Sequence, residues 1–171
     1  EVQVAQTFAE DVKRRDFTIN ALGLDAKGNM IDLVGGMDDM LDGVISAVGS
    51  ADARFAEDHL RMLRAVRFAV RLGFDLAKDV TDAIEVHADK INKVSVERVK
   101  DELFKMASLD GDKFADAILM LDEVGLLVHV LPEVKALQEV FETMRWHPEA
   151  YEFGEGTSFD HVICALRQNM E

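Results

Sequence analysis

One run of residues constrains the fold of this chain more than any other: Glu57 to Leu72, with the sequence EDHLRMLRAVRFAVRL. Its leucines and valines recur every three or four residues, which is the spacing of a helix face that packs on a core. A carboxylate, several arginines and one phenylalanine follow the same spacing on a different side. The run therefore predicts a helix with one buried face and one charged face.

The charged face carries a hydrogen-bond acceptor and a donor one helical turn apart. Asp58 can only accept hydrogen bonds and Arg61 can only donate them. Cytosine and adenine present an amino donor beside a ring-nitrogen acceptor, whereas uracil and guanine present a carbonyl beside an N–H. Asp58 with Arg61 would therefore match cytosine and adenine. The spacing alone favours a simpler alternative, an intrahelical Asp–Arg pair worth about 0.2–0.5 kcal/mol on an exposed face.

The overall charge restricts any phosphate contact to a local patch. The chain has 171 residues and a formal net charge of −14, which excludes a uniformly basic surface. Between residues 54 and 71, arginines outnumber carboxylates: Arg54, Arg61, Arg64, Arg67 and Arg71 against Glu57 and Asp58. The last third, residues 110–171, is the most acidic part and does not favour phosphate binding.

Composition favours one or two small, helix-rich globular domains. Hydrophobic residues make up 49% of the chain and there are only 2 prolines. The single cysteine, Cys164, excludes an internal disulfide and fits a reducing cytosol. The sequence shows no signal peptide and no apolar run of membrane-spanning length. We therefore expect a cytoplasmic protein with no membrane partner.

The hydrophobic pattern changes near Ala51. Before it, residues 1–12 show no helix or strand start that could stand alone. Two strands joined by a turn at 25–29 and a third strand at 44–48 are expected. After it, helices are expected at about 51–72, 74–88, 95–108, 113–124, 128–145 and 158–170, with Leu131-Pro132 as an interruption in the fifth. Gly73 would end the first helix, and Ser95 would cap the third.

A second polar group precedes the first predicted strand. Arg14 and Arg15 could clamp a phosphate, and Asp16 or Asn20 could bond a ribose hydroxyl. The alternative is a charged loop before a strand.

Two acidic or histidine-containing groups invite a metal interpretation, but neither has the spacing of a metal loop. They are Asp32, Asp38, Asp39 and Asp42 in the N-terminal part, and His147, Asp160, His161 and Cys164 near the C-terminus. We therefore expect no metal site in this chain. The aromatic residues Trp146, Tyr151, Phe153 and Phe159 are expected to pack around a loop.

Four motifs then occur in order: RRDFTINAL at 14–22, DLVGG at 32–36, EDHLRMLRAVRFAVRLGF at 57–74 and SVERVKDEL at 95–103. Together they resemble the bacterial-type (class II) tRNA nucleotidyltransferase and poly(A) polymerase family, over residues 14–134. The resemblance implies a template-independent polymerase that adds nucleotides from ATP and CTP to an RNA 3′ end, with tRNA as the expected RNA.

The resemblance also implies roles for particular residues. Arg14, Arg15 and Asp16 would bind the sugar and phosphates of the incoming nucleotide, while Asp58 and Arg61 would form the protein template for C and A. The other expected site residues are Asn20 and Arg64 in the nucleotide site, Glu57 as support for the template, Asp32, Gly35 and Gly36 in a loop linked to switching between nucleotides, and Glu97, Arg98 and Glu102 in a motif that braces the neck.

The family's first motif, a Gly-Gly strand followed by a DxD-type pair that holds two magnesium ions, has no counterpart here. Transfer by two metals requires those carboxylates. We therefore expect an N-terminally cut chain that is inactive alone, with no catalytic residue and with Mg²⁺ bound only in the full-length enzyme. The expected fold is mainly α with a few N-terminal strands: the end of an α/β head at 1–50, a helical neck at 51–109 and the start of a helical body at 110–171.

Three alternatives remain open. The motifs do not separate CCA addition from poly(A) or A-only addition. A stand-alone helical RNA-binding module without catalysis would carry the same helices. The segment HPEAYEFGEGTSFDH also resembles the opening of a body region that can be related to HD-type hydrolase domains.

Overall fold

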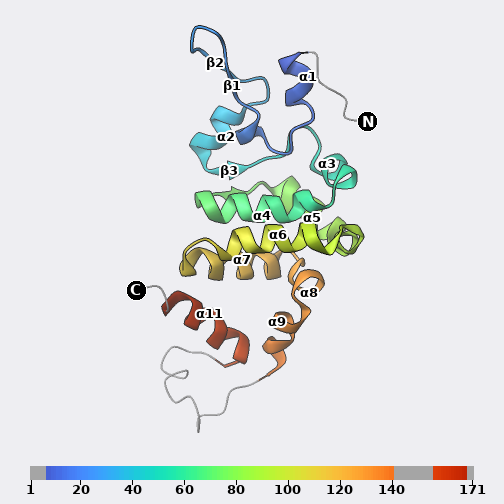
Figure 1. Ribbon diagram of the computed structural model, residues 1–171, viewed down its shortest axis with the longest axis vertical. Coiled ribbons are helices and arrows are strands. Elements are labelled where there is room, and N and C mark those ends of the chain that lie inside the picture. Colours follow the sequence, from blue (N-terminus) through green and yellow to red (C-terminus); the bar gives the residue numbers. More distant parts are fainter. Residues whose placement is uncertain (1–6, 141–155, 169–171) are drawn as a thin grey trace.

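The computed structural model describes residues 7–140 and 156–168. Its elements follow one another down the long axis, with short strands and small helices at one end, the longest helices in the middle and further helices at the other end (Figure 1). The described residues are mainly helical with four two-residue strands, which confirms the predicted fold class.

The N-terminal segment begins with α1 (Phe8–Val12). Thr7 and Glu10 form a capping box: the Thr7 hydroxyl accepts from the Glu10 N–H, and the Glu10 carboxylate accepts from the Thr7 N–H. The sequence was expected to show no helix start in residues 1–12 that could stand alone, but α1 begins there with its own capping box, and the T-x-x-E pattern is its sequence signal.

Short strands follow. A 3₁₀ helix, η1 (Thr18–Asn20), forms where the first expected strand would begin. The residue before it, Phe17, makes only an isolated antiparallel bridge with Ala47. Strands β1 (Gly23–Leu24) and β2 (Met30–Ile31) pair antiparallel around the predicted turn. After α2 (Gly36–Asp42), strand β3 (Val44–Ile45) pairs in parallel with β4 (Asp75–Leu76), which joins the N-terminal segment to the helical part.

The expected single helix at 51–72 is wrong, because the chain forms α3 (Ala51–Glu57) and α4 (Leu60–Leu72). Asp58 lies between them in an extended conformation, with φ −150° and ψ 103°. Its carboxylate accepts a hydrogen bond from the Leu60 N–H at 3.1 Å. An Asp that bonds the free N–H groups of a helix start also suits the positive end of the helix dipole.

The remaining helices lie near their predicted positions. They are α5 (Lys78–His87), η2 (Ala88–Lys93), α6 (Val96–Ala107), α7 (Gly111–Glu123), α8 (Leu127–Val130), α9 (Pro132–Ala136), η3 (Leu137–Glu139) and α11 (Ser158–Gln168). Gly73 ends α4 with φ +70°, as predicted. Ser95 occupies the N-cap position of α6, but its hydroxyl makes no capping hydrogen bond. Pro132 divides the helix expected at 128–145, of which residues 141–145 lie outside the described residues.

Helix α4 is at the centre of the core. Its Leu60, Leu63, Val66 and Val70 are buried as predicted, and the helix packs against α6 and α7 (Figure 1). Phe159 of α11 is also buried in this core. The other three predicted packing aromatics, and His147, lie outside the described residues. No helix in the described part of the chain is both long enough and apolar enough to cross a membrane.

Candidate nucleotide-binding site

A pocket of about 320 Å³ lies where the N-terminal segment meets the start of α4. Its lining residues are Arg14, Arg15, Asp16, Asp58, Leu60, Arg61, Arg64 and Arg98. Five arginines face two carboxylates, so the local charge is positive in a chain whose net charge is −14. Such a reversal of sign favours an anionic ligand.

Asp16 joins the N-terminal segment to α4 at the wall of this pocket. It is 7% exposed, and its two carboxylate oxygens accept from Arg64 Nε at 2.6 Å and from Asn20 Nδ2 at 2.7 Å. Burial alone would raise the pKa of Asp16, but the Asn20 hydrogen bond and the Arg64 charge outweigh it and lower the pKa. Asp16 is therefore ionised at neutral pH, and Asn20 holds Asp16 rather than lining the pocket.

Arg14 and Arg15 are both held by Asp11, which the sequence analysis did not include in the site. Arg15 donates from Nε and Nη2 to Asp11 at 3.0 and 2.8 Å, and Arg14 Nη2 lies 3.4 Å from the same carboxylate. The spacing of three and four residues on one helical turn was the available signal. Both arginine side chains remain between 42% and 49% exposed, so a ligand can reach them.

Asp58 is held at the pocket wall by two donors from different helices. Besides the Leu60 N–H, its carboxylate accepts from Arg98 Nη2 of α6 at 2.7 Å. Burial raises the pKa of Asp58, while the Arg98 and Leu60 hydrogen bonds lower it and dominate. Arg98 was expected only as a brace of the neck, and the structure places it in the pocket beside Asp58.

Arg61 does not pair with Asp58, so the simple Asp–Arg ion pair considered from the spacing is wrong. Its Nη1 donates to Glu57 at 2.8 Å and to the Arg54 carbonyl oxygen at 3.0 Å, and its Nη2 donates to the Arg14 carbonyl oxygen at 3.3 Å. Glu57 therefore bonds Arg61 directly, and its role as support for the template stays a prediction.

The hydrogen-bonding capacity of the two template candidates is only partly used. Asp58 receives one hydrogen bond at each oxygen, so about two of its roughly four acceptor positions remain. Arg61 has five N–H donors, and its Nε–H and one Nη2–H have no partner among the described residues. A base edge could therefore bond to both side chains without breaking their supports.

The three residues of the predicted loop, Asp32, Gly35 and Gly36, lie outside the pocket and form the turn into α2. The Asp32 carboxylate accepts hydrogen bonds from four consecutive backbone N–H groups, at residues 34–37. These bonds, led by the one from residue 37, lower the pKa of Asp32. Gly35 has φ +79°, and a Cβ on Gly36 would collide with the Thr18 carbonyl oxygen. Both glycines are required by the backbone.

In the motif that was expected to brace the neck, Glu102 is buried and Glu97 is exposed. Glu102 is 2% exposed and accepts from Arg67 Nε at 2.6 Å and Lys105 Nζ at 2.8 Å. This ion pair ties α4 to α6. Glu97 is exposed in the first turn of α6 and contributes no side-chain contact of this kind to the described structure.

Within residues 7–140 and 156–168, no group of three or more His, Cys, Asp or Glu side chains is arranged to hold a metal ion.

Two family models and two CCA-adding enzymes are similar to parts of this chain. Residues 1–46 match the family model described as the poly A polymerase head domain. Residues 73–138 match the model described as a probable RNA and SrmB-binding site of polymerase A. The CCA-adding enzyme of Lactobacillus johnsonii is 46% identical over 119 residues, covering 70% of this chain and 30% of that protein. The CCA-adding enzyme of Geobacillus kaustophilus is 40% identical over 148 residues, covering 85% of this chain and 36% of that protein.

The chain belongs to the bacterial-type tRNA nucleotidyltransferase and poly(A) polymerase family. It spans about a third of the length of the two CCA-adding enzymes compared above.

Solved structures of this nucleotidyltransferase family have the same fold. The Bacillus stearothermophilus CCA-adding enzyme in complex with CTP has a TM-score of 0.64 and 41% identity, covering 72% of this chain and 31% of that one. A tRNA nucleotidyltransferase complexed with a primer tRNA and an incoming ATP analog has a TM-score of 0.65 and 28% identity, covering 96% of this chain and 50% of that one.

Proposed function

We propose that this chain supplies the nucleotide-recognition and RNA-binding part of a CCA-adding enzyme, which extends tRNA 3′ ends with nucleotides from CTP and ATP. One observation carries the proposal: Asp58 and Arg61 line the same positive pocket and keep unused acceptor and donor capacity. The CTP and tRNA complexes of related enzymes support this choice of ligands.

The base would be selected by hydrogen bonds. The free acceptor positions of Asp58 would receive the amino group of cytosine or adenine, and Arg61 would donate to the neighbouring ring nitrogen. Guanine and uracil would place a carbonyl against Asp58 and an N–H against Arg61, so each would leave a polar group unpaired. One well-formed pair of such bonds discriminates by about 1–3 kcal/mol. Arg98 and Glu57 would keep the two template side chains in position, because each bonds one of them directly.

The phosphates would lie against the remaining arginines. Arg14 and Arg15 are half-exposed, and Arg64 is about one-third exposed while its Nε is fixed on Asp16. Guanidinium groups on a firm support bind phosphate oxygens in a defined orientation. Asp16 and Asn20 would then act mainly by positioning Arg64.

The wider assignments belong to the same proposal. We propose that residues 1–50 form part of a head domain, 51–109 a helical neck and 110–171 the start of a helical body. Transfer would require Mg²⁺ held by other residues of the enzyme. We also propose a cytoplasmic location, which the presence of a single cysteine in this chain fits.

The proposal is tested by titrating the chain with ATP, CTP, GTP and UTP in parallel and following amide NMR shifts. CTP and ATP should shift the resonances of residues 14–16 and 57–64, whereas GTP and UTP should not. Arg61→Ala should abolish this preference. Arg71→Ala removes an arginine from the same helix outside the pocket and should leave the preference unchanged.

Equal shifts with all four nucleotides would show that the pocket binds phosphate without reading the base, and would overturn the template proposal. Absence of shifts with any nucleotide would overturn nucleotide binding by this chain.

A further inference from the structure

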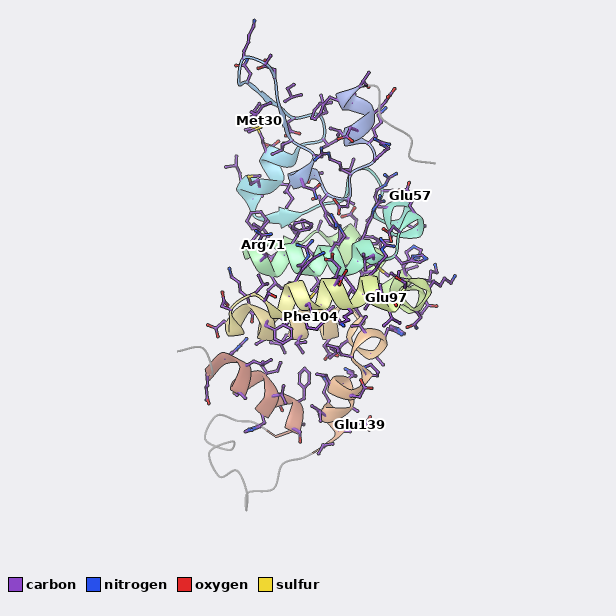
Figure 2. The ribbon with its side chains drawn as sticks, viewed as in Figure 1. Met30, Glu57, Arg71, Glu97, Phe104 and Glu139 are labelled. Atoms are coloured by element: carbon purple, nitrogen blue, oxygen red, sulfur yellow. The ribbon has the colours of Figure 1, made fainter. Side chains whose placement is uncertain are left out.

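A second basic pocket, of about 580 Å³, lies beside α4 and α6. Its lining residues are Arg67, Arg71, Phe104, Lys105, Ser108 and Leu109. None of them lines the nucleotide pocket. Figure 2 shows Arg71 of α4 and Phe104 of α6 away from Glu57, at the end of α3, and from Glu97, at the start of α6.

The cations of this second pocket are only partly neutralised by the described residues. Arg67 and Lys105 share one carboxylate, that of Glu102. The guanidinium of Arg71 has no carboxylate partner in the described part of the chain. Three cations therefore face one buried carboxylate, so the pocket carries a positive charge in an acidic chain.

Arg67 gives the pocket a rigid donor. The residue is 8% exposed, its Nε is bonded to Glu102, and its guanidinium lies over the Phe68 ring at 4.3 Å from the centroid. Its Nη1 and Nη2 make no hydrogen bond with the described residues, although the side chain lines the pocket. A buried arginine with unused donors at a cavity wall favours a phosphate ligand.

Phe104 adds an aromatic surface beside these cations. It is 59% exposed, and Lys100 Nζ lies 5.3 Å from its ring centroid. The Ser108 hydroxyl donates to the Phe104 carbonyl oxygen at 2.7 Å, which secures the end of α6. An exposed ring next to guanidinium groups is the arrangement that stacks an unpaired base beside its phosphate.

The spacing along α4 relates the two pockets. Arg64 and Arg71 are seven residues apart, which corresponds to about 10 Å at a rise of ~1.5 Å per residue. Stacked nucleotides rise ~3.4 Å each along one strand, so this separation spans about three nucleotides. A strand whose 3′ end reaches the first pocket could therefore place an upstream nucleotide in the second.

We infer that the second pocket is a binding site for single-stranded RNA, in which Arg67, Arg71 and Lys105 bind a phosphodiester and Phe104 stacks the adjacent base. The site would hold the primer strand about three nucleotides behind the incoming nucleotide. The inference rests on the proposed function for its ligand, but on a separate set of side chains.

The test measures binding of a fluorescein-labelled RNA hexamer to the full chain by anisotropy across a salt series. Arg71→Ala should weaken binding about tenfold, the effect of one lost charge-assisted hydrogen bond. It should also reduce the slope of log K against log[salt] by about 0.7, as expected for one phosphate of a single strand. Phe104→Ala should weaken binding at least about fivefold without changing the slope.

Two controls make the test specific. Lys27→Ala removes an exposed cation from the β1–β2 turn, far from α6, and should leave RNA affinity unchanged (Figure 1). A hexamer with abasic residues should bind wild type and Phe104→Ala equally, because it has no base to stack.

Wild-type affinity and salt slope in both Arg71→Ala and Phe104→Ala would overturn the inference. The inference would also be overturned if Arg71→Ala weakened the binding of an acidic peptide but left RNA binding unchanged. Nucleotide titration separates this site from the proposed function: RNA binding that depends on Arg71 without C and A selectivity supports the second pocket alone, and selectivity without such dependence supports the first alone.

Discussion

Removing the Glu102 carboxylate should destabilise the chain strongly, because this group connects α4 and α6 inside the core. Glu102 is 2% exposed and accepts hydrogen bonds from Arg67 at 2.6 Å and Lys105 at 2.8 Å. In Glu102→Ala, Lys105 can turn to solvent because its side chain is 55% exposed. Arg67 is 8% exposed and would remain buried without a counter-charge.

The expected loss of unfolding free energy comes from Arg67, which stays buried, and not from Lys105, which can reach solvent. Breaking a buried ion pair by removing one partner costs about 3–5 kcal/mol. The contact of Arg67 with the Phe68 ring remains and partly compensates, so we expect the lower part of that range, about 3 kcal/mol. This is a large fraction of a typical unfolding free energy of about 5–15 kcal/mol.

Urea unfolding followed by far-UV circular dichroism measures the difference in the free energy of unfolding. Glu97→Ala is the matched control, because it makes the same substitution at an exposed position in the same helix. It should cost no more than about 0.5–1 kcal/mol, the value of an acidic residue in a first helical turn. The double variant Arg67→Met, Glu102→Leu should recover most of the loss, since removing both charges leaves none unpaired.

Two results would refute this reasoning. One is a difference of less than about 1 kcal/mol between Glu102→Ala and Glu97→Ala, the size expected if the pair were solvent-screened. The other concerns the double variant Arg67→Met, Glu102→Leu. If its loss of unfolding free energy equals the sum of the losses in Arg67→Met and in Glu102→Leu, the two side chains act as independent sites.

Three further predictions concern other parts of the molecule. Asp58→Ala should reduce the preference for C and A over G and U by about tenfold, within the ~1–3 kcal/mol of a paired base contact, and an unchanged preference in the nucleotide titration would contradict the template. Burial would raise the pKa of Glu102, but the bonds from Lys105 and Arg67 outweigh it and hold the pKa below its ordinary value of 4.5. Stability from Glu102 should therefore be present above pH 4.5 and be lost as pH falls through the depressed folded-state value, and urea unfolding should show a flatter acid profile for Glu102→Gln than for wild type. Gly36→Ala should destabilise by more than about 2 kcal/mol because its Cβ meets the Thr18 carbonyl, whereas Gly28→Ala, with φ +84° and no neighbour, should cost only about 1–2 kcal/mol; similar unfolding midpoints would contradict the proposed clash.

Short-range patterns were sufficient for much of the fold. The spacing of Leu60, Leu63 and Val66 identified the buried face of α4, because helical periodicity depends only on neighbours along the chain. Gly73 likewise ended α4 at a position where a left-handed conformation favours glycine. The order of four motifs was enough to indicate the family.

The break between α3 and α4 depends on competition that periodicity does not record. The apolar spacing continues through the run, but Asp58 adopts an extended conformation and bonds the Leu60 N–H instead of continuing the helix. The Asp58 side chain can then accept from Arg98, which lies 40 residues later in the sequence.

The sequence by itself determined which helix would be buried, where glycine was needed and which residues carry the family motifs, because these depend on local spacing and backbone conformation. Only the tertiary structure decided the partners that charged groups find far away in the sequence. Arg64 bonds Asp16 across 48 residues, and Arg67 bonds Glu102 across 35. Packing of the N-terminal segment and α6 against α4 determines which carboxylate each arginine reaches, and therefore which guanidinium donors remain for a ligand.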